Sequence, residues 1–189
     1  MIDIEKLKIR SLESNDPSRS IYDFEANNLD DATKLESEKN LYEQVQNYGM
    51  VMSSALLLGL SKRIIDSAKL YTCDREQFGK PIGSFQAVKH MCAEMAADLE
   101  PCYAMLWQAA HSFDHDPDEA RLQACQAKSH IAEVAKMVSK KATEVHGGMG
   151  FTDLLGLHYW FKRIGLNRQI LGGPELVREE AAELQGFNQ

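Results

Sequence analysis

Cysteine is scarce in this chain of 189 residues, and its placement excludes the usual cysteine-based scaffolds. The four cysteines, at positions 73, 92, 102 and 125, form no CxxC pair and show no zinc-site spacing. Three of them occupy apolar positions of helical patterns, where a reduced thiol packs as a small apolar side chain. We therefore expect no disulfide framework and no metal site, and we expect a cytoplasmic protein.

Positive charge and long apolar runs are also scarce. Lysine and arginine number 21 against 28 acidic residues, a net charge of −7, which argues against a surface for nucleic acid. The longest apolar stretch, residues 50–60, contains serines and glycine and is far too short to cross a bilayer. The N-terminus shows no pattern typical of a signal peptide. We expect neither a nucleic-acid partner nor a membrane partner.

Histidines come nearest to a metal-binding pattern at His111 and His115, which stand four residues apart beside Asp114 and Asp116. Two imidazoles alone make a poor zinc site, because structural zinc takes four protein ligands. The surrounding segment, residues 111–118, is polar and interrupts a helical pattern. We interpret it as a solvated loop.

Residues 1–35 differ from the rest of the chain, because their apolar residues alternate with a period of two. Leu7 and Ile9 alternate with charged residues, and residues 21–24 form a second β-prone run. The turn-forming residues 15–18 lie between the two runs. Two strands joined by a loop are marginal in water by themselves. They must pack either on the helices that follow or in a larger sheet of which they are the end, and we favour the larger sheet.

From about residue 36 the period changes to 3.6, which predicts helices over the remainder of the chain. We expect an all-α fold, an up-down helical bundle over residues 36–189, preceded by a short N-terminal β-hairpin remnant in residues 1–35. The predicted helices cover about residues 36–72, 84–110, 116–146, 154–164 and 174–185.

Capping residues set these predicted boundaries. Ser84 and Asp116 are expected caps, Pro174 an expected first residue, and Gly147 with Gly148 an expected stop. The apolar stripe that predicts the first helix comprises Leu41, Val45, Tyr48, Met52, Leu56, Gly59 and Ile64.

The segment DREQFGKPIGSFQ, residues 74–86, is too specific to be only a connection between two helices. It places a cation, Arg75, beside an aromatic ring, Phe78, at a turn. A guanidinium binds phosphate and a ring stacks on a planar group, so the segment suits a planar anionic ligand. Taken with the distant pair Gly147 and Gly148, it indicates a flavin dinucleotide site.

These two segments resemble motifs of one family. Residues 75–82, REQFGKPI, followed by Phe85 and Gln86, resemble the R-x-x-F-G-x-x-I…Q stretch of acyl-CoA dehydrogenases. Residues 146–151, HGGMGF, resemble the GGxGF loop of that family. The resemblance covers residues 37–187 and implies a C-terminal helical domain, with residues 1–35 similar to the last strands of the family's middle β-domain. The chain is thus similar to a truncated form of a much longer flavoprotein.

The resemblance implies a set of FAD-binding residues, because the family's tetramers bind FAD at a subunit interface. It places Arg75 near the pyrophosphate and Phe78 against the adenosine half, with Gln77 and Gln86 as polar contacts. Gly147 and Gly148 would let the backbone approach the ADP portion. We expect the two segments to meet across a contact between two copies of the chain.

One departure concerns the position three residues before the glycine pair. The family frequently has a glutamine there, and this chain has Glu144. We expect Glu144 to lie in the same cofactor region, where its carboxylate would repel a pyrophosphate.

The catalytic base of the family has no counterpart here. In the family a glutamate removes the α-proton of an acyl-CoA thioester while hydride leaves for FAD. The resemblance places Gly172 at one of its two positions and Gly49 or Met50 at the other, and none of these can act as a base. Glu175 lies nearby, but in a first helical turn, where the helix dipole alone favours a carboxylate. We expect no catalytic residue in the chain and no dehydrogenation by the chain alone.

Three functions remain open. The chain is an acyl-CoA dehydrogenase domain completed by other polypeptide, with an acyl-CoA as substrate. It is a non-catalytic subunit that supplies half of an FAD site to a companion. Or it is a helical interaction protein that has lost FAD, since fold does not fix chemistry. The first two imply a homo-oligomer, dimer or tetramer, or a heteromeric dehydrogenase.

Overall fold

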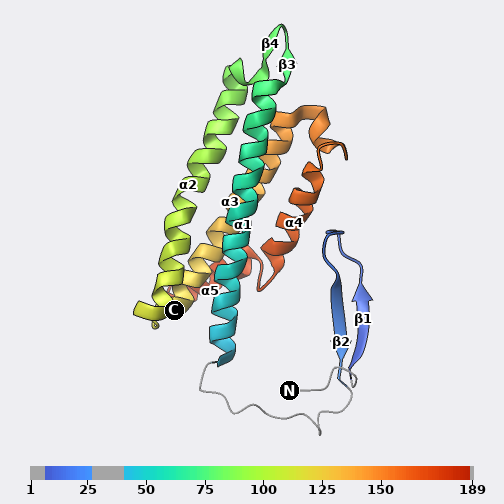
Figure 1. The fold of residues 1–189 in the computed structure, drawn as a ribbon. Helices are drawn as coiled ribbons and strands as arrows, with labels where there is room; N and C mark the ends of the chain where they lie inside the picture. The colour runs from blue at the N-terminus through green and yellow to red at the C-terminus, as the bar shows by residue number, and fades with distance from the viewer. Residues whose placement is uncertain (1–6, 27–40, 188–189) are drawn as a thin grey trace.

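The computed structural model describes residues 7–26 and 41–187, which form a helical bundle with a two-stranded hairpin beside it (Figure 1). The elements in chain order are β1 (Lys8–Leu12), β2 (Ile21–Glu25), α1 (Leu41–Asp74), β3 (Glu76–Gln77), β4 (Lys80–Pro81), η2 (Ile82–Ser84), α2 (Gln86–His115), α3 (Ala120–His146), η3 (Gly147–Phe151), α4 (Leu157–Gln169) and α5 (Pro174–Leu184). The expected all-α bundle with a short N-terminal hairpin is confirmed. Over the described ranges, no helix has the length and apolar composition that crossing a membrane requires.

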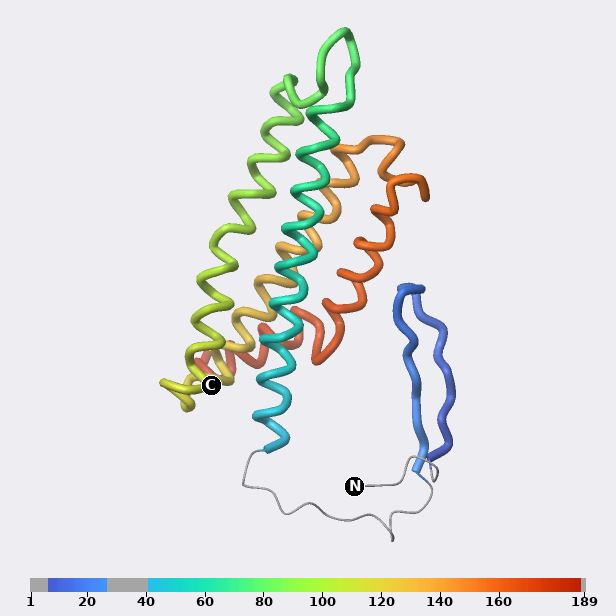
Figure 2. Tube along the Cα trace, in the orientation of Figure 1, coloured from blue at the N-terminus to red at the C-terminus, as the bar shows by residue number. Residues whose placement is uncertain are grey.

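Helix α3 is the centre of the bundle, and it contacts α1, α2, α4 and α5 (Figure 2). Alanine makes these close approaches possible, because a methyl side chain lets a neighbouring helix pack near the backbone. The alanines of α3 that are buried are Ala120, Ala124, Ala127, Ala132, Ala135 and Ala142. The helix ends at His146, and Gly147, with a φ of 58°, follows as its C-cap. The glycine stop signal is therefore confirmed.

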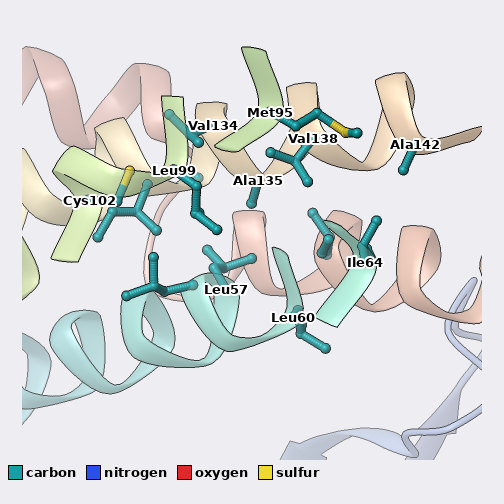
Figure 3. Close-up of a cluster of buried hydrophobic side chains, with 14 of the residues drawn as sticks. Leu57, Leu60, Ile64, Met95, Leu99, Cys102, Val134, Ala135, Val138 and Ala142 are labelled. Carbon is teal, nitrogen blue, oxygen red and sulfur yellow. The ribbon is translucent and has the colours of Figure 1, made fainter. Parts of the chain in front are cut away.

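The core lies where α1, α2 and α3 meet (Figure 3). Leu57 and Ile64 come from α1, Met95 and Leu99 from α2, and Val138 from α3. Complete burial of each such side chain stabilises the fold by about 1.5–3 kcal/mol relative to leaving it in water. The core thus joins three long helices into a single packed unit.

The buried face of helix α1 differs from the face that the sequence pattern indicated. Of the predicted apolar stripe, Val45 and Met52 are 60% and 73% exposed, Leu41, Tyr48 and Leu56 are also exposed, and only Ile64 is buried. The buried residues of the helix include Met50, Ser54, Leu57, Ser61, Ile64 and Ala68. The helix is apolar on two faces, so periodicity alone selected the face that the rest of the chain does not cover.

The corner between α1 and α2 is a small hairpin, β3–β4, followed by the short helix η2. Its turn residues Phe78 and Gly79 both have positive φ, 55° and 74°, as in the two-residue turns whose twist matches paired strands. Ser84 does not cap α2 as expected, because its Oγ donates to the carbonyl of Pro81, the residue before η2. Helix α2 begins at Gln86 instead.

The N-terminal hairpin is attached to α4 through its loop. The buried carboxylate of Asp16 accepts a hydrogen bond from Nε of Arg163 at 2.7 Å, and Arg19 donates to the side chain of Asn167 at 3.2 Å. Strands β1 and β2 themselves remain largely exposed. The predicted domain boundary at residues 35 and 36 lies outside the described residues, so that division stays a prediction.

Candidate functional site

A groove of about 510 Å³ lies where the end of α1 and the β3–β4 hairpin approach the end of α3. We call it the Arg75 groove. Its lining consists of Tyr71, Arg75, Gln77, Ile82, Val145, His146, Gly147, Gly148, Met149 and Thr152. Four residues expected at a cofactor site from the sequence are thus brought together within one chain. The expectation that the two segments need a second copy in order to meet is wrong for these four.

Arg75 stands at the start of the hairpin with its backbone fixed on both sides. Its N–H donates to the carbonyl of Tyr71, and its carbonyl accepts from the N–H of Ile82, both at 2.8 Å. Among the described residues it forms no ion pair, not even with its neighbours Asp74 and Glu76. The guanidinium is therefore available to an external anion.

The two glycines of the groove have different physical reasons for being glycine. Gly147 has φ 58° and ψ −142°, a conformation that side chains disfavour strongly. Gly148 has no such φ, and a Cβ added to it would meet no atom of the chain within 4 Å. Internal packing does not explain the missing side chain of Gly148, but close approach of a ligand to the backbone does.

Tyr71 and His146 were not identified from the sequence, and they form part of the groove. Their rings stack with centroids 4.4 Å apart, and the Tyr71 hydroxyl donates to the His146 carbonyl at 3.4 Å. The only sequence signal was that His146 directly precedes the glycine pair. The 75-residue separation of the two rings hid their contact.

The charge of the groove favours an anion. Arg75 is its one fully charged lining residue, and the lining contains no carboxylate. This is notable in a chain with a net charge of −7. Its volume falls in the range of roughly 300–1,000 Å³ that is usual for small-molecule sites.

Phe78 and Gln86 lie outside the lining of this groove. Phe78 is 93% exposed at the tip of the β3–β4 hairpin, which projects beyond one end of the bundle (Figure 1). Its ring meets that of Phe85 edge-on at 6.1 Å, and Lys80 Nζ lies 4.4 Å from the Phe85 ring centroid. Gln86 is exposed at the first turn of α2. Both remain predicted cofactor contacts, and both face solvent in the single chain.

Glu144 lines a different groove of about 480 Å³, together with residues that include Lys140, Phe151, Phe161 and Lys162. We call this the Phe161 groove. In the single chain the carboxylate therefore lines neither wall of the Arg75 groove. The repulsion expected between Glu144 and a pyrophosphate has no support in this placement.

The two expected positions of the missing base lie close together. A Cβ added to Gly49 would come within 2.5 Å of Leu171 Cδ1, so Leu171 packs directly on that glycine. Gly172 has φ 102°, and a Cβ there would approach Val177 Cγ2 at 2.9 Å. Met50, the other candidate position, is buried in the core.

Glu175, the nearest carboxylate in sequence, is a poor base. A hydrogen bond from its own backbone amide in the first turn of α5 lowers its pKa, and Arg168, whose Nη2 lies 3.3 Å away, lowers it further. A carboxylate stabilised in its charged form accepts a proton less readily.

His111 and His115 belong to the last turns of α2 rather than to a loop, which corrects that interpretation. Their rings stack with centroids 3.9 Å apart. Over residues 7–26 and 41–187, no three histidine, cysteine or acidic side chains gather in a way that could hold a metal ion.

Comparison with known protein families identifies the family of this domain. Residues 43–183 match the family described as acyl-CoA dehydrogenase, C-terminal domain. This chain therefore belongs to the acyl-CoA dehydrogenase family and comprises its C-terminal helical domain. FAD is the cofactor of that family.

Particular relatives agree with this assignment. The chain is similar to acyl-CoA dehydrogenase FadE34 of Mycobacterium tuberculosis, with 36% identity over 132 residues, covering 69% of this chain and 19% of FadE34. A solved FAD complex of PigA is similar with 29% identity and a TM-score of 0.67, covering 72% of this chain and 35% of PigA.

A third match is to a chain of the ChsE4–ChsE5 complex from M. tuberculosis, with a TM-score of 0.84 and 24% identity. It covers 96% of this chain and 49% of that one, and it shows a shared fold. This chain thus spans between about a fifth and a half of the proteins that it resembles.

Proposed function

We propose that the chain supplies the diphosphate-binding face of an FAD site for α,β-dehydrogenation of an acyl-CoA thioester. The observation that carries this proposal is the Arg75 groove, where Arg75, Gln77, Gly147 and Gly148 meet. We propose residues 36–189 as the bundle domain that holds the groove, and residues 1–35 as part of a β-domain.

The groove fits the diphosphate portion of FAD. Arg75 would hold phosphate oxygens with its unpaired guanidinium, and the open backbone at Gly148 would let the diphosphate approach. Phe78 and Gln86 would extend the contact toward the adenosine half from outside the groove. When bound, FAD accepts the hydride that leaves the acyl β-carbon.

The isolated chain does not dehydrogenate an acyl-CoA on this proposal. Gly172 and Gly49 offer no titratable group, and Leu171 fills the space beside Gly49. Glu175 is held in its charged form by its own amide and Arg168. On this proposal the base comes from residues outside this chain's described bundle.

A non-catalytic subunit of a heteromeric dehydrogenase is the second candidate. The packing of Leu171 on Gly49 favours it, because Leu171 fills the space in which the side chain of a base would lie. The ChsE4–ChsE5 complex, one chain of which shares this fold, is a precedent for a complex of this kind. A helical interaction protein without FAD is the third reading.

Binding of FAD tests the proposal directly. The purified chain is titrated with FAD and followed by flavin fluorescence and native mass spectrometry. We expect binding by the wild type and a loss of about tenfold or more in Arg75→Met, because a charge-assisted contact is removed. Arg178→Met, an exposed cation on α5, is the matched control and should bind as the wild type does.

Absence of FAD binding in every oligomeric form, and also after addition of a companion dehydrogenase chain, would leave only the helical interaction protein. A separate assay with acyl-CoA substrates and an artificial electron acceptor addresses the base. Reduction of the acceptor by the isolated chain would contradict the proposed lack of a base.

A further inference from the structure

We propose that the Arg75 groove binds a hydroxyl group of its ligand beside the diphosphate, and that Nε2 of His146 accepts this hydrogen bond. The groove would thus select a nucleotide with an intact ribose over a bare diphosphate. This inference rests on the proposed function, and it gives a role to a side chain that was not identified from the sequence. Its basis is the set of polar atoms in the groove that have no partner in the described chain.

The ring of His146 is held in one tautomer and one plane. Its Nδ1 lies 2.7 Å from the carbonyl oxygen of Ala142, and a carbonyl can only accept, so Nδ1 carries the proton. The ring stacks on Tyr71 with centroids 4.4 Å apart, and the Tyr71 hydroxyl donates to the His146 carbonyl at 3.4 Å. A neutral imidazole has one ring proton, so Nε2 is left as a hydrogen-bond acceptor.

Nε2 of His146 is open to the groove, although the residue as a whole is buried. His146 is 4% exposed, and it lines the groove. Among the described residues Nδ1 has a hydrogen-bond partner and Nε2 has none. The fully buried side-chain atoms that lack a partner in these ranges are Nδ1 of His158 and Nε of Arg168, so Nε2 of His146 keeps access to solvent. A buried polar residue with one accessible, unpaired atom fits a partner that arrives from outside the chain.

The unpaired groups of the groove match a ligand that carries both an anion and a hydrogen-bond donor. The guanidinium of Arg75 donates, which suits phosphate oxygens. Nε2 of His146 accepts, as a phosphate oxygen also does, so a donor of the ligand must face the ring. Gln77 adds a second acceptor, because its amide nitrogen donates to the Glu76 carbonyl at 2.8 Å and its Oε1 has no partner among the described residues. In the ADP portion of FAD, the ribose hydroxyls next to the diphosphate are such donors.

Two variants remove the acceptor while they keep the position filled. His146→Phe retains a ring against Tyr71, and His146→Leu replaces the ring with a different apolar shape. Arg75→Met removes the cation of the same groove for comparison. His158→Phe is the matched control, because His158 lines the Phe161 groove and its ring packs on Tyr159 with centroids 3.9 Å apart. Thermal unfolding and circular dichroism establish that each variant folds.

The probes are inorganic pyrophosphate, ADP, 2′-deoxyADP and 3′-deoxyADP, each titrated by calorimetry. We expect one of the two deoxy analogues to bind the wild type about three- to tenfold more weakly than ADP, because it leaves Nε2 unpaired. His146→Phe should lose a similar factor for ADP, bind that analogue and ADP equally, and bind pyrophosphate as the wild type does. Arg75→Met should weaken all four probes, and His158→Phe should weaken none.

The results separate this inference from the proposed function. If both deoxy analogues bind the wild type as tightly as ADP, or if His146→Phe still distinguishes them from ADP, the hydroxyl contact is wrong and the proposed function stands. Equal losses of pyrophosphate and ADP affinity in His146→Phe would also overturn it, since the residue would then act on the diphosphate. If the wild type binds neither ADP nor FAD, the proposed function fails and this inference fails with it. If His146→Phe does not fold, His146→Leu and the wild-type analogues decide the question.

Discussion

Two adjacent glycines differ in what the backbone requires of them. Only Gly147 has a conformation that needs glycine, whereas Gly148 does not.

Lys128 is a charged residue in the interior of the bundle. It is fully buried, and its Nζ donates to the Asn167 carbonyl at 2.6 Å and to Ser53 Oγ at 3.0 Å, which ties α3 to the last turn of α4.

Alanine at the two glycines should give opposite phenotypes. Gly147→Ala places a side chain at φ 58° and ψ −142°, and we expect it to lower the free energy of unfolding by about 1–3 kcal/mol. Gly148→Ala should leave that free energy unchanged or slightly raised, and should weaken FAD binding. Urea unfolding and FAD titration of both variants check this. Unimpaired FAD binding by Gly148→Ala would show that the open space beside it is not a ligand site.

Lys128 should give the protein a distinctive alkaline pH dependence. Burial lowers the pKa of Lys128 to about 8, and nearby Arg168 lowers it as well. Between about pH 8 and the ordinary value of 10.5 the unfolded chain then binds more protons than the folded chain. The free energy of unfolding contributed by this group therefore rises with pH over that window.

Lys128→Met should remove that rise, as measured by urea unfolding at pH 7, 8.5 and 10. Ser53 Oγ also donates to the Asn167 carbonyl, at 3.3 Å, so we expect that carbonyl to keep one hydrogen bond in the variant. Burial raises the pKa of Cys102 and of Cys125 to about 11, which acts in the opposite direction. Both cysteines are present in both proteins, so the difference between the two curves isolates the lysine. Parallel curves would contradict the prediction.

At the scale of elements, the two apolar faces of α1 have different tasks. One face packs on α2 and α3 through Leu57 and Ile64. The other carries Val45, Met52 and Leu56, which are 36–73% exposed in the described chain. The hairpin β1–β2 has a similar character, because its loop is anchored on α4 while its strands stay exposed.

Two adjacent leucines of α1 test this division. Leu57 is completely buried, whereas Leu56 is 36% exposed on the other face. We expect Leu57→Ala to cost about 2–5 kcal/mol of unfolding free energy, because it leaves a cavity among three helices. Leu56→Ala should cost no more than about 0.5 kcal/mol. Chemical denaturation of the two variants measures the contrast, and similar losses would mean that the faces are assigned wrongly.

At the scale of the whole molecule, the sequence predicted the bundle well and the functional surfaces less completely. Helix ends marked by Gly147 and Pro174 were predicted, because glycine and proline restrict the backbone locally. The buried face of α1 was not predicted, since the periodic pattern of a helix that is apolar on two sides does not indicate which side is buried. The pairing of Tyr71 with His146 depends on a tertiary approach of α1 and α3 that no local pattern encodes.

The uncovered face of α1 leads us to expect self-association. Soluble monomers rarely expose large apolar patches, and the exposed apolar residues here extend along the first half of α1, from Leu41 to Leu56. Sedimentation velocity over a concentration series should show dimers or tetramers of the wild type. Met52→Glu, at a position 73% exposed, should shift the distribution toward monomer without lowering the thermal midpoint. A wild type that stays monomeric throughout would instead point to a different polypeptide as the partner.

Both walls of the Arg75 groove belong to one polypeptide, residues 71–82 on one side and residues 145–152 on the other. On the proposed function, the residues that bind the dinucleotide therefore lie apart from the positions expected for the base. A chain that lost the base by substitution would keep every residue of the Arg75 groove.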